Sequence, residues 1–305
     1  MATWQEIKDE INAISTPDKC DIVRRRKLAA LNRITGRNLV IYVVDFLSPK
    51  SRLVGDQVGI DLNDKEGFLE VTKDLQGDNL DVLIFSPGGT AEAVESIVAI
   101  LRNKFTHIRF IIPSVAKSAA TMLAMSGNEI IMDEVSELGP TDPQMIVNRD
   151  GNIVVAPAHA IKEQFALASK EIMDNSKKLS PWLPVLRQYG PSLLSECDRS
   201  LALSNKLVSK WLKEYMFQGE RNAGIKANRI AKYLTSKVQF QSHARRIGID
   251  DLISKGVKVV DLRQDIPLKT AIWDVHIAIS QTFSSTFAYK MFENHNGQAL
   301  IKSVS

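Results

Sequence analysis

Two stretches of sequence decide the fold: LIFSPGGT at residues 83–90 and IIPSVAKSAAT at residues 111–121. In the first, a pair of glycines directly follows an apolar run typical of a buried strand. In the second, Ser118 stands among small residues where an apolar helical run begins. Glycines let backbone N–H groups approach a ligand closely, and a helix N-terminus presents unpaired N–H groups. We therefore expect the two stretches to bring their backbones together around one reacting atom.

Ser118 is the candidate nucleophile of this arrangement. The helix that follows would place its N-terminal N–H groups beside the serine oxygen, where they favour negative charge. The N–H groups of Gly89 and Ala119 form a candidate oxyanion hole, and Gly88 and Thr90 are candidate substrate-binding residues. Taken singly, the same residues fit an N-cap serine and a glycine turn equally well. Their combination favours a catalytic site.

A third stretch, ELGPTDPQ at residues 137–144, completes a recognisable pattern. The three stretches together resemble the Clp/crotonase superfamily, most closely its serine dehydrogenase proteinase branch, whose members are relatives of signal peptide peptidase A. The resemblance is close over residues 31–145 and looser at SHARRIG, residues 242–248. It implies an α/β protein built as a ββα superhelix, a serine peptidase of the Clp class, and assembly into a homo-oligomer.

The order of apolar runs agrees with that fold class. Strands and helices alternate after the first apolar strand, which is typical of βαβ units with parallel pairing. Predicted strands cover residues 39–44, 80–85, 107–112 and 129–132, and predicted helices cover residues 65–75, 90–103 and 117–126. A hairpin with its turn at Asp150-Gly151 should follow.

Four segments are expected along the chain. They are an N-terminal helical arm (1–34), a Clp/crotonase core with the nucleophile (35–157), a helical region with the last core elements (158–262) and a C-terminal helical tail (263–305). Within the tail, residues 271–290 are an apolar, amphipathic stretch suited to packing on a neighbour. The basic run RRRK at residues 24–27 favours a solvated helix face or a contact between subunits over a nucleic-acid patch.

The base that activates the serine is harder to identify. Clp-type proteases carry a histidine beyond the nucleophile, but this chain reads TDPQ at residues 141–144. The resemblance therefore points to the serine–lysine dyad of signal peptide peptidases, in which a desolvated lysine has a lowered pKa and acts as the base. Lys170 is the predicted base, because its separation from Ser118 resembles that in the shorter signal peptide peptidases and it shares a helix face with apolar residues.

Other groups remain open as the base. Lys162 lies on the same predicted helix, His159 precedes it, and His243 lies in the SHARRIG segment. Each is more often a surface charge or a hydrogen-bonded structural group than a base. Lys117 is adjacent to the nucleophile, and adjacent side chains point in different directions, so it is better suited to binding a substrate carboxylate or tuning Ser118.

Asp142 and Gln144 follow Gly139-Pro140 in the loop that the resemblance places beside the cleft. Their expected role is to hold that loop by bonds from side chain to backbone. Orienting the substrate is the second interpretation.

The amino-acid composition limits the classes of function that the sequence fits. The 305 residues are 44% apolar, with 39 basic and 35 acidic side chains interspersed, which favours an ordinary enzyme over a nucleic-acid-binding protein. The two cysteines lack metal-ligand spacing, and the polar N-terminus and the lack of an apolar run of ~18 residues argue against a signal or a membrane span. We expect a cytoplasmic location and no metal or other cofactor.

The leading hypothesis is thus a soluble intracellular serine endopeptidase whose peptide or protein substrate adds a strand alongside residues 86–89. One alternative is a crotonase-like enzyme acting on an acyl thioester, which needs the oxyanion hole but no serine. Another is a peptide-binding scaffold with weak catalysis, because Ala120 stands where the branch usually has glycine and adds a methyl group near the nucleophile.

Overall fold

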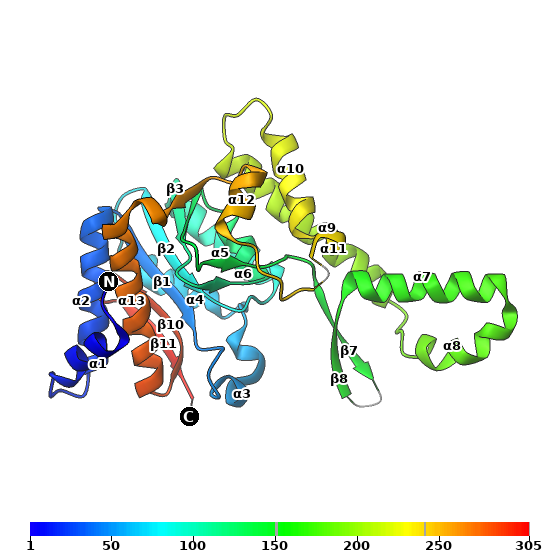
Figure 1. The fold of residues 1–305 in the computed structure, drawn as a ribbon, viewed down its shortest axis with the longest axis horizontal. Coiled ribbons are helices and arrows are strands. Elements are labelled where there is room, and N and C mark those ends of the chain that lie inside the picture. The colour runs from blue at the N-terminus through cyan, green and yellow to red at the C-terminus, as the bar shows by residue number, and fades with distance from the viewer. Residues whose placement is uncertain (150–151, 241, 305) are drawn as a thin grey trace.

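The computed structural model describes residues 1–149, 152–240 and 242–304, and its centre is a seven-stranded sheet (Figure 1). The predicted turn at Asp150-Gly151 lies outside the described residues. The strand order is β11-β10-β1-β2-β3-β5-β9. The strands are β1 (Asn38–Val44), β2 (Asn79–Phe85), β3 (His107–Ile111), β5 (Glu129–Met132), β9 (Val259–Asp261), β10 (Ala288–Asn294) and β11 (Ala299–Ser303).

Five neighbouring strands, from β1 to β9, are parallel, and β10 and β11 add an antiparallel edge. β1 and β2 are apolar along almost their whole length because helices cover both faces of the sheet, as is usual for parallel strands. The predicted α/β class is confirmed.

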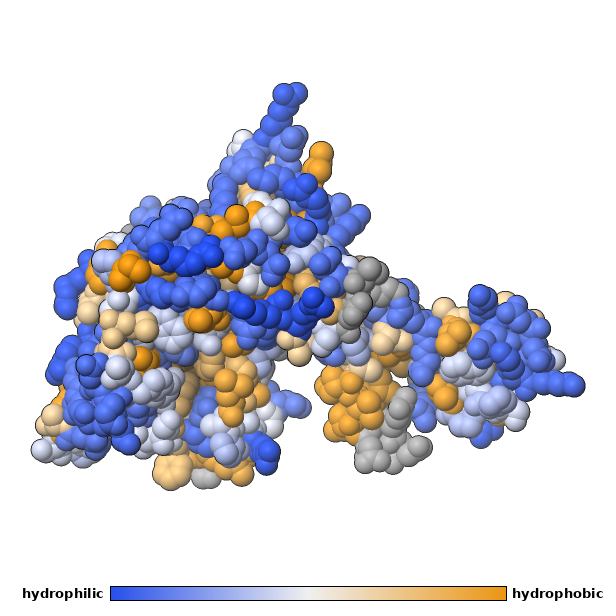
Figure 2. All heavy atoms as spheres, in the orientation of Figure 1, coloured by the Kyte–Doolittle hydropathy of each residue, from blue (hydrophilic) through white to orange (hydrophobic). Residues whose placement is uncertain are grey.

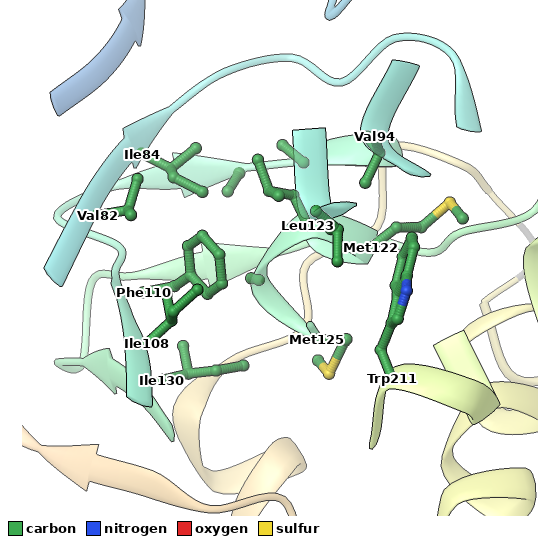
Figure 3. Packing of buried hydrophobic residues seen from close by; sticks show 14 of the residues in the cluster. Val82, Ile84, Val94, Ile108, Phe110, Met122, Leu123, Met125, Ile130 and Trp211 are labelled. Carbon is green, nitrogen blue, oxygen red and sulfur yellow. The ribbon is translucent and has the colours of Figure 1, made fainter. Parts of the chain in front are cut away.

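One face of the sheet is covered by α2 (Lys19–Thr35) and α13 (Ile266–Ser285), with α1 (Trp4–Asn12) packed against both. The opposite face carries the larger core, to which Val82, Phe110, Leu123 and Trp211 contribute (Figure 3). Its helices are α4 (Asp64–Thr72), α5 (Ala91–Lys104), α6 (Ala119–Ala124), α9 (Leu193–Trp211), α10 (Ala223–Leu234) and α12 (Ile249–Lys255).

The core repeats one unit: a sheet strand, a short second strand and a helix. Ile60 follows β1, residues 86–89 follow β2, β4 (Val115–Ala116) follows β3, and β6 (Glu137–Leu138) follows β5. These second segments pair in parallel with one another, Ile60 with Gly89, Ser86 with Ala116, and β4 with β6. This is the predicted ββα superhelix, and it lines up the turns that carry the site.

An arm extends from this body (Figure 1). It consists of β7 (Gln144–Arg149), β8 (Asn152–Pro157), α7 (Ala158–Asp174), η2 (Ser176–Lys178) and α8 (Leu179–Leu186), and α9 leads back to the core. Apolar side chains of the hairpin, Ile146, Ile153 and Val155, are largely exposed (Figure 2). The remaining short elements are α3 (Ser51–Val54), η1 (Gly55–Val58), η3 (Leu212–Met216), α11 (Lys237–Phe240) and η4 (Leu262–Gln264).

The C-terminal segment differs from the helical tail expected from the sequence. The helix ends at Ser285, and residues 288–303 form β10 and β11 of the main sheet. α13 itself packs on α2 and the sheet of its own chain. An apolar helical stretch looks the same whether it covers its own sheet or a neighbour, so the sequence pattern did not separate the two cases.

The basic run at residues 24–27 is also different from the expected solvated face. Arg24 is fully buried, and its Nε donates to Oε2 of the equally buried Glu293 at 2.6 Å. Arg25 donates to the other oxygen of the same carboxylate at 2.7 Å. The expectation was wrong for Arg24 because its partner comes from β10, far along the sequence.

A second buried ion pair supports the segment before α4. The Nζ of Lys290 on β10 donates to both oxygens of Asp64 at 3.0 Å and to the carbonyl of Gly59 at 2.7 Å. Neither charged side chain is exposed, and Tyr42 donates to the same carboxylate at 2.8 Å. Burial lowers the pKa of Lys290, while Asp64 acts in the opposite direction. The cluster thus fixes Gly59, directly before the residue that pairs with Gly89.

Replacing Lys290 by Met should lower the free energy of unfolding by about 3 kcal/mol, because it leaves a buried carboxylate short of its main partner. Lys302→Met is the matched control. Lys302 also contacts Asp64, at 3.1 Å, but it is partly exposed, and its loss should cost about 1 kcal/mol or less. Urea unfolding of both variants measures the difference, and equal losses would contradict the structural role given to Lys290.

Candidate active site

Ser118 stands directly before α6 in an unusual backbone conformation, with φ 50° and ψ −118°. It is the one non-glycine residue with positive φ in the described part of the chain. Such a conformation costs on the order of 1–3 kcal/mol and persists only where the surroundings enforce it. The Ser118 side chain makes no capping hydrogen bond to α6. The N-cap interpretation therefore fails, and the hydroxyl is left for another purpose.

The glycine turn packs directly against this serine. A Cβ at Gly88, where φ is 108°, would lie 2.7 Å from the carbonyl oxygen of Lys117 and 2.7 Å from the Cβ of Ser118. A Cβ at Gly89 would lie 2.2 Å from both the backbone nitrogen and the carbonyl oxygen of Ile60. Neither position has room for a side chain. The two stretches lie in contact, as the sequence predicted.

The backbone donors of these turns are available to a ligand. Neighbouring groups are used, since Ile60 N–H donates to Gly88 O at 2.7 Å and Thr90 N–H donates to Ile60 O at 3.0 Å. The N–H groups of Gly89 and Ala119 have no hydrogen-bond partner among the described residues. They are the two donors that the sequence assigns to the oxyanion hole.

A cavity of about 200 Å³ opens at Ser118. Four segments line it: residues 89–92 at the start of α5, the first turn of α6, the loop at residues 141–144, and the middle of α9. The N-termini of α5 and α6 both face this cavity, so their dipoles favour negative charge there. The cavity brings Ser118, Gly89, Ala119 and Thr90 together, while Gly88 touches Ser118 from beside it.

One sequence expectation about this cavity needs revision. Ala120 is fully buried and does not line it, so its methyl group does not narrow the pocket. The segment at residues 86–89, alongside which a substrate strand is expected, pairs through Ser86 with Ala116 and through Gly89 with Ile60, while the Gly89 N–H has no partner among the described residues. Thr90, a predicted substrate-binding residue, uses its hydroxyl to cap α5 by accepting from Ala93 N–H.

The loop after β6 is fixed on the nucleophile turn. Gly139 N–H donates to the hydroxyl of Thr121 on α6 at 3.0 Å, and a Cβ at Gly139 would lie 2.7 Å from the Lys117 side chain. Lys117 Nζ donates to Glu137 at 3.0 Å and to the carbonyl of Leu138 at 3.1 Å. Its ammonium group is thereby committed to the loop, as expected for a residue that is not the base.

The same loop carries a carboxylate–imidazole pair. The Nδ1 of His243 lies 2.8 Å from Oδ1 of Asp142, and Gln144 donates to the other oxygen of Asp142 at 3.1 Å. The two side chains are only 24% and 13% exposed. Reciprocal backbone bonds of 3.0 Å between Leu138 and Ile247 hold the two segments together. Sequence reasoning considered His243 and Asp142 separately and did not connect them.

The other candidate bases lie in the arm. Lys170 is exposed on α7, twelve residues beyond Ala158, which corresponds to about 18 Å along the helix axis. Lys162 forms an ion pair with Asp198, and Nε2 of His159 lies 3.2 Å from the carbonyl of Thr235. The cavity lining includes none of these three residues, and it does not include His243 either. Lys170 as the base stays a prediction.

Residues 1–149, 152–240 and 242–304 contain no group of three or more His, Cys, Asp or Glu side chains placed to hold a metal ion. Within the same residues, no helix has both the length and the apolar character required to cross a bilayer.

Comparison with known proteins agrees with the sequence pattern. Residues 57–178 match the family described as ClpP-like SDH-type serine proteinase. This stretch includes Ser118, both glycines of the turn and Asp142, but ends before His243. The resemblance to the serine dehydrogenase proteinase branch is confirmed over these residues.

Two relatives come from the archaeon Methanocaldococcus jannaschii. Uncharacterized protein MJ0137 is 36% identical over 87 residues, which are 28% of this chain and 30% of that protein. Uncharacterized protein MJ1495 is 27% identical over 203 residues, 66% of this chain and 59% of that protein. The chain thus spans less than two thirds of either relative. Among solved structures, a mutant of the 1510-N membrane-bound stomatin-specific protease has 15% identity and a TM-score of 0.41, covering 70% of this chain and 79% of that one.

The contact at Gly89 can be tested by Gly89→Ala. We expect it to lower the free energy of unfolding by about 3 kcal/mol, because the new methyl group meets backbone atoms that cannot rotate away. Gly77→Ala is the control: φ is also positive there, at 84°, but nothing lies within 4 Å of the new Cβ. Its cost should be limited to about 1–2 kcal/mol of backbone strain. Urea unfolding compares the two, and equal losses would show that Gly89 is not tightly enclosed.

Proposed function

We propose that this chain, which carries a ClpP-like SDH-type serine proteinase sequence over residues 57–178, is a serine endopeptidase. One observation carries the proposal. Ser118 is held in a strained conformation with its hydroxyl unused by the helix, at a cavity where the N–H groups of Gly89 and Ala119 are unpaired. Strain of this kind gathers at functional sites.

The chemistry follows from this geometry. The Ser118 oxygen attacks a peptide carbonyl carbon, and the carbonyl oxygen becomes an oxyanion. The N–H groups of Gly89 and Ala119 donate to that oxyanion, and the N-termini of α5 and α6 add their positive dipole ends. Removing one such donor typically costs a factor of about 10²–10³ in rate. The leaving amine departs with a proton, and water then hydrolyses the acyl-enzyme. None of these steps requires a metal or a nucleotide.

We propose His243 as the base that takes the serine proton, because it is paired with a carboxylate in the loop beside the cavity. Asp142 stands between Thr141 and Pro143, which line the cavity with Ser118. An ionised Asp142 accepts a hydrogen bond from Nδ1–H of His243, and this fixes the tautomer in which Nε2 is free to accept a proton. Nε2 has no partner within the described part of the chain. Lys170, the base implied by the resemblance, is the competing proposal.

The oligomeric state, the location and the substrate are inferred from the sequence alone. A homo-oligomer and a cytoplasmic location stay predictions, and the substrate is proposed to be an extended peptide or an unfolded chain. We propose that the peptide lies beside the unpaired Gly89 N–H and reaches Ser118 along the open side of the cavity.

Ser118 should be labelled by a fluorophosphonate, because an activated serine beside an oxyanion hole attacks phosphorus as it attacks a carbonyl. Mass spectrometry of the labelled protein identifies the modified residue. Ser118→Ala should abolish both labelling and peptide hydrolysis while leaving the unfolding curve nearly unchanged. An unlabelled wild type would refute the peptidase and favour a peptide-binding scaffold of the same fold.

The identity of the base is decided by the rate of the same labelling. His243→Gln should slow labelling of Ser118 by a factor of about 10²–10⁴, the usual contribution of a positioned general base. His243→Gly should recover part of the rate when imidazole is added, because free imidazole can occupy the space left by the side chain. His159→Gln is the matched control, since that histidine lies in the arm and bonds the backbone carbonyl of Thr235.

Lys170→Ala is labelled in parallel. Unchanged labelling of the Lys170 variant together with slow labelling of the His243 variants supports His243. The reverse pattern would establish the serine–lysine dyad instead.

A further inference from the structure

The floor of the Ser118 cavity contains a hydroxyl without a partner. Thr141 is only 3% exposed, it lines the cavity, and its Oγ1 has no hydrogen-bond partner among the described residues. Buried polar side-chain atoms are nearly always paired, so an unpaired one requires an explanation. Arg102 Nε and His276 Nδ1 are likewise unpaired, but neither residue lines this cavity.

The position of Thr141 is fixed by its backbone. Its N–H donates to the carbonyl of Leu234 at 2.8 Å, and its carbonyl accepts from the hydroxyl of Ser204 at 2.8 Å. The residue is therefore held between α9 and α10 without help from its own side chain. The hydroxyl remains free to bond a group that enters the cavity.

The rest of the cavity wall combines apolar and polar surface in similar amounts. Ala119, Met122 and Leu203 supply apolar surface around the hydroxyl. Glu92 is the one charged residue that the described lining contains, and it lies exposed at the start of α5. A charged group entering the cavity would find no opposite charge at the floor, and burying an unpaired charge is expensive.

We propose that this cavity is a specificity pocket that selects an uncharged side chain with an apolar stem and a hydrogen-bonding tip, such as glutamine. The inference rests on the proposed peptidase function. The selected residue is the one whose carbonyl Ser118 attacks, because its side chain branches one bond from that carbonyl and so enters the cavity at Ser118. The stem packs on Met122 and Leu203, and the terminal amide bonds the hydroxyl of Thr141.

The size of the cavity agrees with this occupant. About 200 Å³ is more than the ~150 Å³ cavity known to hold benzene. It therefore accommodates the side chain of glutamine or of methionine. Size alone does not discriminate between these two, so the hydroxyl must.

Discrimination follows from what each side chain does to Thr141. The amide of glutamine gives the buried hydroxyl a hydrogen bond, whereas methionine leaves the hydroxyl unpaired. Sites built to bond a polar group reject analogues that lack it. Leaving one neutral group unpaired costs about 1–3 kcal/mol, which corresponds to roughly a 5- to 150-fold difference in rate. Glutamate has the same shape but brings a charge, and should be cut more slowly than methionine.

The test compares peptides that differ only at this position, carrying Gln, Met or Glu, with the full chain as the enzyme. Wild type should cleave after Gln with a kcat/KM about tenfold above that after Met, and slowest after Glu. Cleavage sites are verified by mass spectrometry. Thr141→Val replaces the hydroxyl with a methyl group of similar shape and should remove the preference for Gln over Met. Thr141→Ser keeps the hydroxyl and should retain the preference.

The outcomes separate this inference from the function on which it rests. Wild type that cleaves after Met at least as well as after Gln overturns the inference, as does an undiminished preference in Thr141→Val. Label on Ser118 without cleavage of the Gln peptide also overturns it. A wild type that is neither labelled nor active overturns the proposed peptidase itself. If Thr141→Val fails to fold, the inference is still tested by wild type and Thr141→Ser. Both should cleave after Gln faster than after Met, and the absence of this preference would overturn the inference.

Discussion

The rest of the site depends on the contact between the glycine turn and the serine turn. Gly88 lies so close to Ser118 that a Cβ would clash with it, and Gly89 is enclosed by the backbone of Ile60. Three successive turns of the superhelix therefore meet at one place without side chains between them. This close approach leaves the N–H groups of Gly89 and Ala119 unpaired beside the serine oxygen. A larger residue in either glycine position would separate the two helix N-termini that make this region favourable for an anion.

A residue near the C-terminus helps to hold the glycine turn in place. Lys290 on β10 bonds Gly59 and Asp64 at full burial, and Ile60 follows directly. A buried ion pair seldom adds much to stability compared with an apolar pair, but it is specific in geometry, since a small displacement leaves a charge unpaired. A buried ion pair is therefore suited to fixing the position of a segment more than to stabilising the fold. The C-terminal strands are thus part of the structure that positions the glycine turn.

Local sequence patterns predicted the parts of the fold that local forces determine. The strand–helix alternation, the glycine turn and the serine at the start of α6 were all found where predicted, because apolar runs and small residues indicate them directly. Local sequence patterns did not predict pairings between residues that are far apart along the chain. Arg24 meets Glu293, and Asp142 meets His243, only after the chain has folded. A basic run looks solvated, and a lone histidine looks structural, until its partner is known.

One loop connects the chemistry with the pocket and the arm. Asp142 lies within hydrogen-bond distance of His243, while the neighbouring Thr141 lines the Ser118 cavity and is bonded to Ser204 on α9. That helix begins among arm residues, where Leu193 packs with Ile161, and ends in the main core at Trp211. Interiors are close-packed, so each end of this helix is held by the part of the molecule around it. The helix thus joins the arm to Ser204, which bonds Thr141 at the cavity, although Lys170, Lys162 and His159 in the arm do not line that cavity.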